Sequence, residues 1–104
     1  QQPNPVRVMA EMSGLSERAF VRRFRQVTGL SPLAYVQHIR IEEAKQMLEA
    51  TAIPVEAVAE ALGYEDASFF SRLFRREVQL SPAAYRRKFG GLREVLRLAQ
   101  DASG

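Results

Sequence analysis

The stretch "SERAFVRRFRQVTGLSPLAY" occupies residues 16–35, and a close copy of it, "ASFFSRLFRREVQLSPAAY", occupies residues 67–85. At an offset of 50 residues, nine of the sixteen positions in 20–35 hold the same amino acid in both copies. Upstream of this stretch the offset falls to 49, so the second copy carries one extra residue in its turn. Two copies indicate a duplication, because a solenoid requires at least three repeats.

The whole chain is expected to be helical, since strong helix formers dominate and a two-residue alternation never persists. Ser16 and Asp66 are predicted N-caps, Gly29 a left-handed stop, and the two Ser-Pro pairs further helix starts. The expected helices cover residues 6–12, 17–28, 32–50, 55–62, 67–78, 82–89 and 92–100, and the last four residues are expected to fray.

Each copy contains a short helix that ends at a glycine and a second helix that begins three or four residues later. This is the spacing of a helix-turn-helix. The sequence therefore predicts an all-α fold with two homeodomain-like helix-turn-helix lobes joined by a long connecting helix. The predicted segments are a first lobe (1–31), the connecting helix (32–50), a second lobe (51–89) and a C-terminal tail (90–104).

Positive charge is concentrated on a few of these elements. The net charge is only +3, yet residues 17–28, 67–78 and 86–88 hold ten of the fifteen Lys and Arg and two of the twelve acids. Such clustering favours a polyanionic partner. A solvated basic face without a partner is the alternative that charge alone leaves open.

In the first copy, Phe20, Phe24 and Val27 recur at helical spacing and are expected to face the core. A second stripe at the same spacing consists of Arg18, Arg22 and Arg25. This arginine stripe lies about 200° around the helix from the phenylalanines and should face outward. Its N-terminal half suits base contact in a major groove, where arginine donates two hydrogen bonds to guanine.

The second copy follows the same pattern with different residues. Phe70, Phe74 and Val78 are expected to face inward, with Phe69 near the outer edge, where it could meet a thymine methyl group. The residues expected to face outward are Ser68, Ser71, Arg72, Arg75 and Arg76. Matched stripes in duplicated units favour nucleic acid over an ordinary charged face.

The connecting helix would span about 27 Å at ~1.5 Å per residue. Successive major-groove faces on one side of B-DNA are about 34 Å apart. With the width of the lobes added, both basic helices could enter adjacent major grooves of one duplex.

Other functional classes find little support in the sequence. There is no cysteine, the single histidine is His38, and no acid pair is arranged as in a catalytic cleft, so we expect neither an enzyme nor a metal or cofactor site. No membrane segment or signal peptide is evident, and a cytoplasmic location is expected. A helical protein-interaction module or an RNA binder remains the alternative, although RNA binders usually expose stacking aromatics.

Two stretches resemble a known family: "MAEMSGLSERAFVRRFRQVTGLSPLAYVQHIRIEEAKQML" (9–48) and "PVEAVAEALGYEDASFFSRLFRREVQLSPAAYRRKF" (54–89). They are similar to the two-helix-turn-helix DNA-binding domain of the AraC/XylS-type bacterial transcription regulators. The resemblance implies binding to a double-stranded promoter site, contact with RNA polymerase, and any effector bound by a domain outside this chain. The amino-acid sequence of these stretches also resembles that of members that carry an amidase-like sensing domain upstream.

The resemblance also implies roles for individual residues. Base contacts would come from Arg18, Val21 and Arg22 in the first copy, and from Ala67, Ser68, Ser71 and Arg72 in the second. Arg25 and Arg75 would contact phosphate instead.

Two departures from the family pattern matter. Gln79 stands where the family has glycine, so that helix end is expected to be less well capped. The family domain opens with a further helix, whereas only about five residues precede Val6 here. We therefore expect a fragment of a longer regulator, with a first lobe that is incompletely covered and marginally stable.

Overall fold

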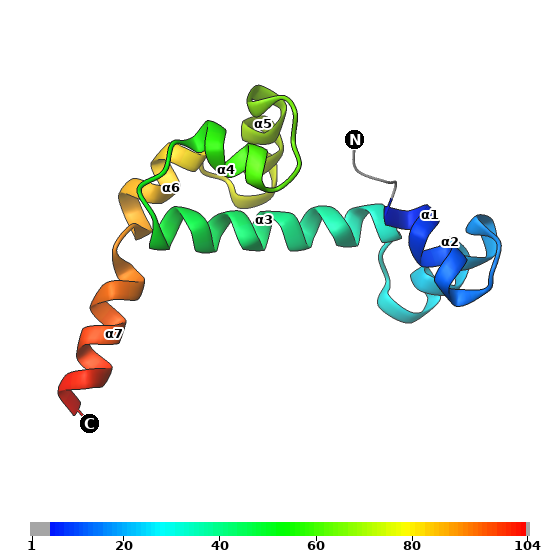
Figure 1. Ribbon diagram of the computed structural model, residues 1–104, viewed down its shortest axis with the longest axis horizontal. Helices are drawn as coiled ribbons and strands as arrows, with labels where there is room; N and C mark the ends of the chain where they lie inside the picture. Colours follow the sequence, from blue (N-terminus) through cyan, green and yellow to red (C-terminus); the bar gives the residue numbers. More distant parts are fainter. Residues whose placement is uncertain (1–4, 104) are drawn as a thin grey trace. The chain divides into compact units, whose positions relative to one another are not determined.

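The computed structural model describes residues 5–103, with Arg93 and Ser103 described by their backbone alone. All regular structure in this range is helical (Figure 1). The helices are α1 (Pro5–Ser13), α2 (Glu17–Thr28), α3 (Pro32–Ala50), α4 (Val55–Ala61), α5 (Ala67–Val78), α6 (Pro82–Phe89) and α7 (Leu92–Ser103). The all-α prediction is confirmed. Within residues 5–103 no helix is both long and apolar enough to cross a membrane.

The last helix corrects one prediction. Residues 101–103 were expected to fray, but α7 continues to Ser103, while Gly104 lies outside the described residues. Arg97 pairs with Glu94 one turn before it and with Asp101 one turn after it. Pairs at these spacings stabilise a helix by about 0.2–0.5 kcal/mol each, and they extend the regular structure through Asp101.

The predicted caps place both basic helices. Ser16 accepts a hydrogen bond from the backbone N–H of Ala19, at 3.1 Å, and so begins α2. Asp66 accepts from the backbone N–H groups of Ser68 and Phe69, at 2.8 and 3.3 Å, and so begins α5. Each cap satisfies backbone donors that a helix start leaves unpaired.

The two basic helices also end alike, in a left-handed residue. This residue is Gly29 after α2, with φ 79°, and Gln79 after α5, with φ 71°. Among the described residues Gln79 is the one non-glycine with positive φ. Its side-chain amide donates to the carbonyl of Arg76 at 2.9 Å, so part of the backbone strain is offset locally.

The chain forms two compact units whose boundary falls inside α3, between Arg40 and Ile41. We call residues 1–40 unit 1 and residues 41–104 unit 2; residues 1–4, at the start of the predicted first lobe, lie outside the described residues. The second half of α3 belongs to the core of unit 2. A long helix can therefore connect two units and still contribute packing surface to one of them.

Unit 2 has a continuous hydrophobic core drawn from four helices. Its buried members are Ile41, Ala44, Leu48, Val58, Ala59, Phe70, Leu73, Phe74 and Tyr85. The Tyr85 hydroxyl donates to the carboxylate of Glu49, which satisfies this polar group at the edge of the core. Burial of Phe70 and Phe74 confirms the inward stripe of α5, whereas Leu73 joins the core without having been predicted there.

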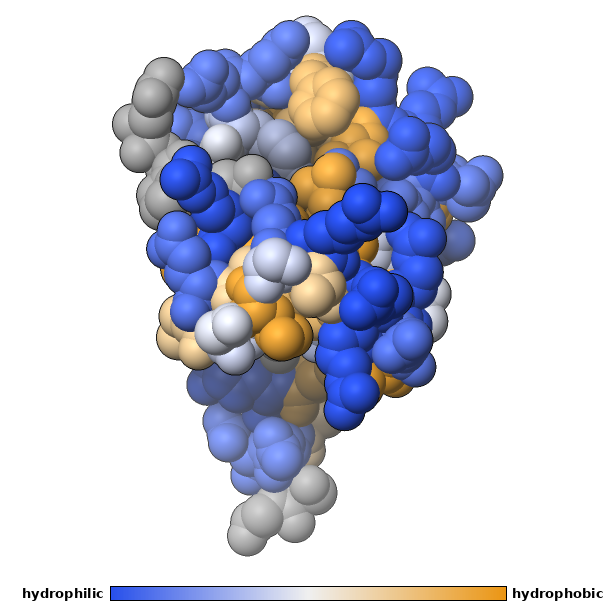
Figure 2. All heavy atoms as spheres, turned by 90° about the vertical axis from the view of Figure 1, so that its right-hand side faces the viewer, coloured by the Kyte–Doolittle hydropathy of each residue, from blue (hydrophilic) through white to orange (hydrophobic). Residues whose placement is uncertain are grey.

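The apolar side chains of unit 1 are buried much less completely than those of unit 2. Its α1 buries Val6 and Ala10, but no residue of α2 is fully buried. Phe20 and Phe24 are half-buried, and the expectation that Val27 faces the core is wrong, because its exposed fraction is 73%. Figure 2, which turns the right-hand side of Figure 1 toward the viewer, shows hydrophobic side chains open to view among hydrophilic ones.

Alignment of the two copies agrees with the exposure of Val27 and the burial of Leu73. At the offset of 50, Val27 corresponds to Glu77 and Arg23 to Leu73. Position 27 is therefore a solvent position in either copy, and α2 has an arginine where α5 has a core leucine. The inward face of α2 is thus narrower and less apolar than that of α5.

A candidate nucleic-acid interface

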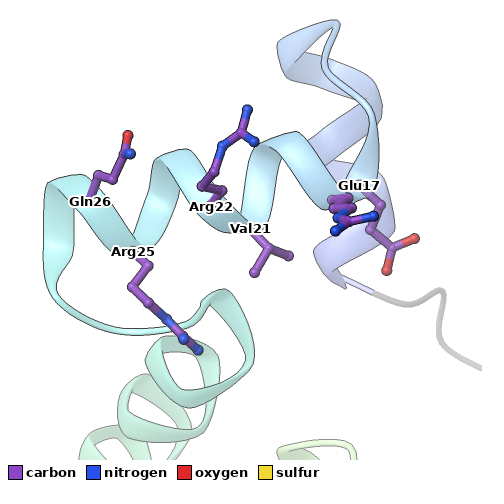
Figure 3. Close-up of a pocket in the computed structure, with 6 residues that line it drawn as sticks. Glu17, Val21, Arg22, Arg25 and Gln26 are labelled. Atoms are coloured by element: carbon purple, nitrogen blue, oxygen red, sulfur yellow. The ribbon is translucent and has the colours of Figure 1, made fainter.

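The outer face of α2 carries the first predicted contact set. Arg18, Arg22 and Arg25 are exposed, and Val21 is half-buried between them. Six side chains of this helix line a shallow hollow: Glu17, Arg18, Val21, Arg22, Arg25 and Gln26. In Figure 3, Arg22 and Gln26 extend together from one side of α2, and Val21 and Arg25 from another.

The outer face of α5 carries the second set. Ser68, Arg72, Arg75 and Arg76 are exposed, while Ala67 and Ser71 are half-buried. Of these arginines, Arg76 pairs with the neighbouring Glu77, at 3.5 Å and with both side chains largely in solvent. Such an exposed pair contributes little to stability and leaves the guanidinium accessible.

The guanidinium groups of the two outer faces are available to an external anion. Within residues 5–103, no acidic side chain lies at ion-pairing distance from Arg22 or Arg72. Both side chains project from the first half of their helices, after a capped N-terminus that itself favours anions. The same chemical arrangement therefore occurs once in each unit.

Two residues of the first hollow are missing from the predicted set. Gln26 lies one turn after Arg22, and Glu17 begins the helix beside Arg18. The i, i+4 spacing from Arg22 would have identified Gln26, whose amide can both donate and accept hydrogen bonds. Gln26 carries no charge, so a pattern of charged residues does not identify it.

No other chemistry emerges elsewhere in the part of the chain that the structure describes. There, no group of three or more His, Asp or Glu is placed to hold a metal ion. His38, the single histidine, is exposed on α3. The arginine faces of α2 and α5 are accordingly the features that distinguish this surface.

Two capped helix-turn-helix units with exposed arginine faces define a DNA-binding domain. The helix-turn-helix domain family matches residues 9–88. The chain belongs to this family, in its AraC type, whose members are transcription regulators.

Curated relatives support this membership. The MmsAB operon regulatory protein of Pseudomonas aeruginosa is 40% identical over 80 residues, which are 77% of this chain and 26% of that protein. The transcriptional activator RhaR of Klebsiella pneumoniae is 37% identical over 78 residues, covering 75% of this chain and 28% of the relative. The chain thus spans under a third of the length of these relatives.

Solved structures agree with the fold. The DNA-binding domain of the transcriptional factor AdpA, crystallised with a target DNA, is 34% identical, with a TM-score of 0.78 and coverage of 85% of this chain and 79% of that one. The C-terminal domain of AraT, a response regulator from Geobacillus stearothermophilus, is 30% identical, with a TM-score of 0.80 and coverage of 86% and 74%. The DNA complex of AdpA favours DNA binding over the protein-interaction and RNA-binding alternatives.

Proposed function

We propose that this chain binds a double-stranded promoter site sequence-specifically and places α2 and α5 in adjacent major grooves. The single observation that carries the proposal is the duplication of one arrangement. In both units a helix with a side-chain N-cap carries, in its first half, an exposed arginine without an acidic partner among the described residues. A single chain with two such helices would read a bipartite, asymmetric site.

Each contact has a proposed role. Base edges would be read by Arg18, Val21, Arg22, Ala67, Ser68, Ser71 and Arg72, and phosphates would be bound by Arg25, Arg75 and Arg76. Arginine fits guanine O6 and N7 in a bidentate manner, and this pair discriminates by about 1–3 kcal/mol. Phosphate neutralisation would supply much of the affinity and would make it fall steeply with salt.

The wider assignment follows from the family. We propose that residues 1–31 and 51–89 act as the two reading lobes, 32–50 as the connector and 90–104 as a tail. Bound at a promoter in the bacterial cytoplasm, the regulator would act by binding and not by catalysis, through contact with RNA polymerase. An effector would bind a domain outside this chain, and the amidase-like type of that domain stays a prediction.

The experiment that tests the proposal is selection of bound sequences from a random duplex library. We expect enrichment of one motif with two conserved blocks and an unrelated spacer between them. The same protein should bind the enriched duplex far more tightly than either separated strand or an RNA of the same sequence. Failure to enrich any motif would contradict sequence-specific binding.

A further inference from the structure

We propose that Phe69 reads a thymine methyl group, so that the two units recognise chemically different half-sites. This inference rests on the proposed function and adds the class of base that unit 2 selects. Its starting point is the contrast between two adjacent rings on α5. Phe70 is fully buried, whereas Phe69 keeps 46% of its surface exposed.

Phe69 lies on the flank of the basic face. Arg72 and Arg76 follow it at i+3 and i+7, so the three side chains form one row along α5, and all three are exposed. The ring sits at the third position of the helix, among the N-terminal residues that approach base edges when such a helix enters the major groove. An apolar side chain there meets the one apolar group of the major-groove edge, the thymine methyl.

The helix cap fixes the backbone at Phe69, and the ring contacts one neighbouring side chain. The backbone N–H of Phe69 donates to the capping carboxylate of Asp66, at 3.3 Å. On its other side the ring packs against Tyr64, with centroids 6.2 Å apart and planes tilted by 45°. A side chain already confined in this way loses little conformational entropy on binding, which favours its use as a contact.

The first copy lacks this feature. At the offset of 50 residues the counterpart of Phe69 is Ala19, while Arg22 and Arg72 occupy equivalent positions. Unit 1 therefore presents arginines around Val21, and unit 2 presents an aromatic ring, two serines and arginines. We expect a guanine-centred half-site for unit 1 and, in the half-site of unit 2, a thymine whose methyl group matters.

The test replaces each thymine of the selected duplex, one at a time, by deoxyuridine, which differs only in the missing methyl group. With the unmodified protein we expect replacement of one thymine, in the half-site of unit 2, to lower the affinity for the duplex about four-fold. This is the factor that corresponds to burial of one methyl-sized group at ~0.8 kcal/mol. The half-site of unit 2 is the half that Arg72→Ala relaxes. Binding is measured by fluorescence anisotropy.

The variant Phe69→Ala restores the residue of the first copy and should bind thymine and deoxyuridine duplexes equally. The matched control is Leu96→Ala, which removes another exposed apolar side chain, 59% exposed on α7, and should keep the four-fold difference. Circular dichroism checks that both variants fold. The deoxyuridine series on the unmodified protein is independent of any folding defect.

Three outcomes would contradict the inference. It is wrong if no thymine in the half-site of unit 2 responds to loss of its methyl group, or if Phe69→Ala keeps the four-fold difference. A random library that enriches no motif would overturn the proposed function and this inference together. A clear motif without a methyl-dependent thymine would overturn the assignment of Phe69 alone.

Discussion

At the scale of the residue, the proposed reading of bases depends on single side chains. Arg22 and Arg72 occupy the same position in the two copies, are exposed, and have no acidic partner among residues 5–103. A guanidinium without a protein partner is free to donate both of its parallel hydrogen bonds to one base. These two residues are therefore the sharpest probes of the proposed contacts.

We predict that Arg22→Ala and Arg72→Ala each weaken binding to the selected site by about 1–3 kcal/mol and relax the base preference of one half-site each. The measurement is a titration of each variant against the selected site and against single-base variants of it. Arg97→Ala is a matched control, because this exposed arginine lies on α7 and pairs with Glu94 and Asp101. An equal loss on random DNA would instead make Arg22 or Arg72 a phosphate contact.

At the scale of the element, the two basic helices end in the same backbone conformation but at different residues. Gly29 and Gln79 adopt nearly the same left-handed conformation, with φ 79° and 71°. Glycine enters this region without steric cost, whereas another residue pays about 1–2 kcal/mol. The amide bond from Gln79 to the Arg76 carbonyl, at 2.9 Å, recovers part of this cost.

We predict that Gln79→Gly raises the free energy of unfolding by about 0.5–1 kcal/mol, since relief of backbone strain exceeds the loss of an exposed hydrogen bond and the added freedom of the unfolded chain. The measurement is urea denaturation. The reciprocal change, Gly29→Gln, should destabilise unit 1, because a residue with a Cβ is strained at a φ of 79°. No atom lies within 4 Å of the added Cβ, so the backbone conformation alone accounts for the expected loss. Destabilisation by Gln79→Gly would show that the side-chain bond outweighs the strain.

At the scale of the whole molecule, the two units bury very different amounts of apolar surface. In unit 2, Phe70 and Phe74 are fully buried and Tyr85 is 7% exposed. In unit 1 their counterparts Phe20 and Phe24 are only half-buried, and Tyr35 is 39% exposed. Burial of one large apolar side chain contributes about 1.5–3 kcal/mol, so the units should differ in local stability.

We predict that the amide hydrogens of α2 exchange at least ~30-fold faster than those of α5, which corresponds to about 2 kcal/mol in opening free energy. The measurement is native-state hydrogen exchange on this chain without DNA. The two helices are matched for length and have side-chain N-caps, so neither of these features accounts for a difference in exchange. Equal protection of α2 and α5 would contradict the expected marginal stability of the first lobe.

The helix caps and the faces of the basic helices could be predicted from the sequence. The N-caps at Ser16 and Asp66 and the stop at Gly29 depend on residues two to four positions apart, and the structure confirms each. Both copies also build the same stack of rings. The centroids of Phe20 and Phe24 are 5.7 Å apart, those of Phe70 and Phe74 5.9 Å. The sequence likewise separated the two arginine faces from the phenylalanines, although their contacts with DNA stay a prediction.

Burial was decided only by the tertiary structure. The repeat predicts equal cores, yet in unit 2 the rings are enclosed by Ile41, Leu48 and Val58, which come from distant parts of the chain. It was the fold that left Val27 in solvent, brought Leu73 into the core and kept Phe69 half-exposed beside Tyr64. A helix and its caps form from neighbouring residues, but the exposure of a side chain depends on which other elements pack over it.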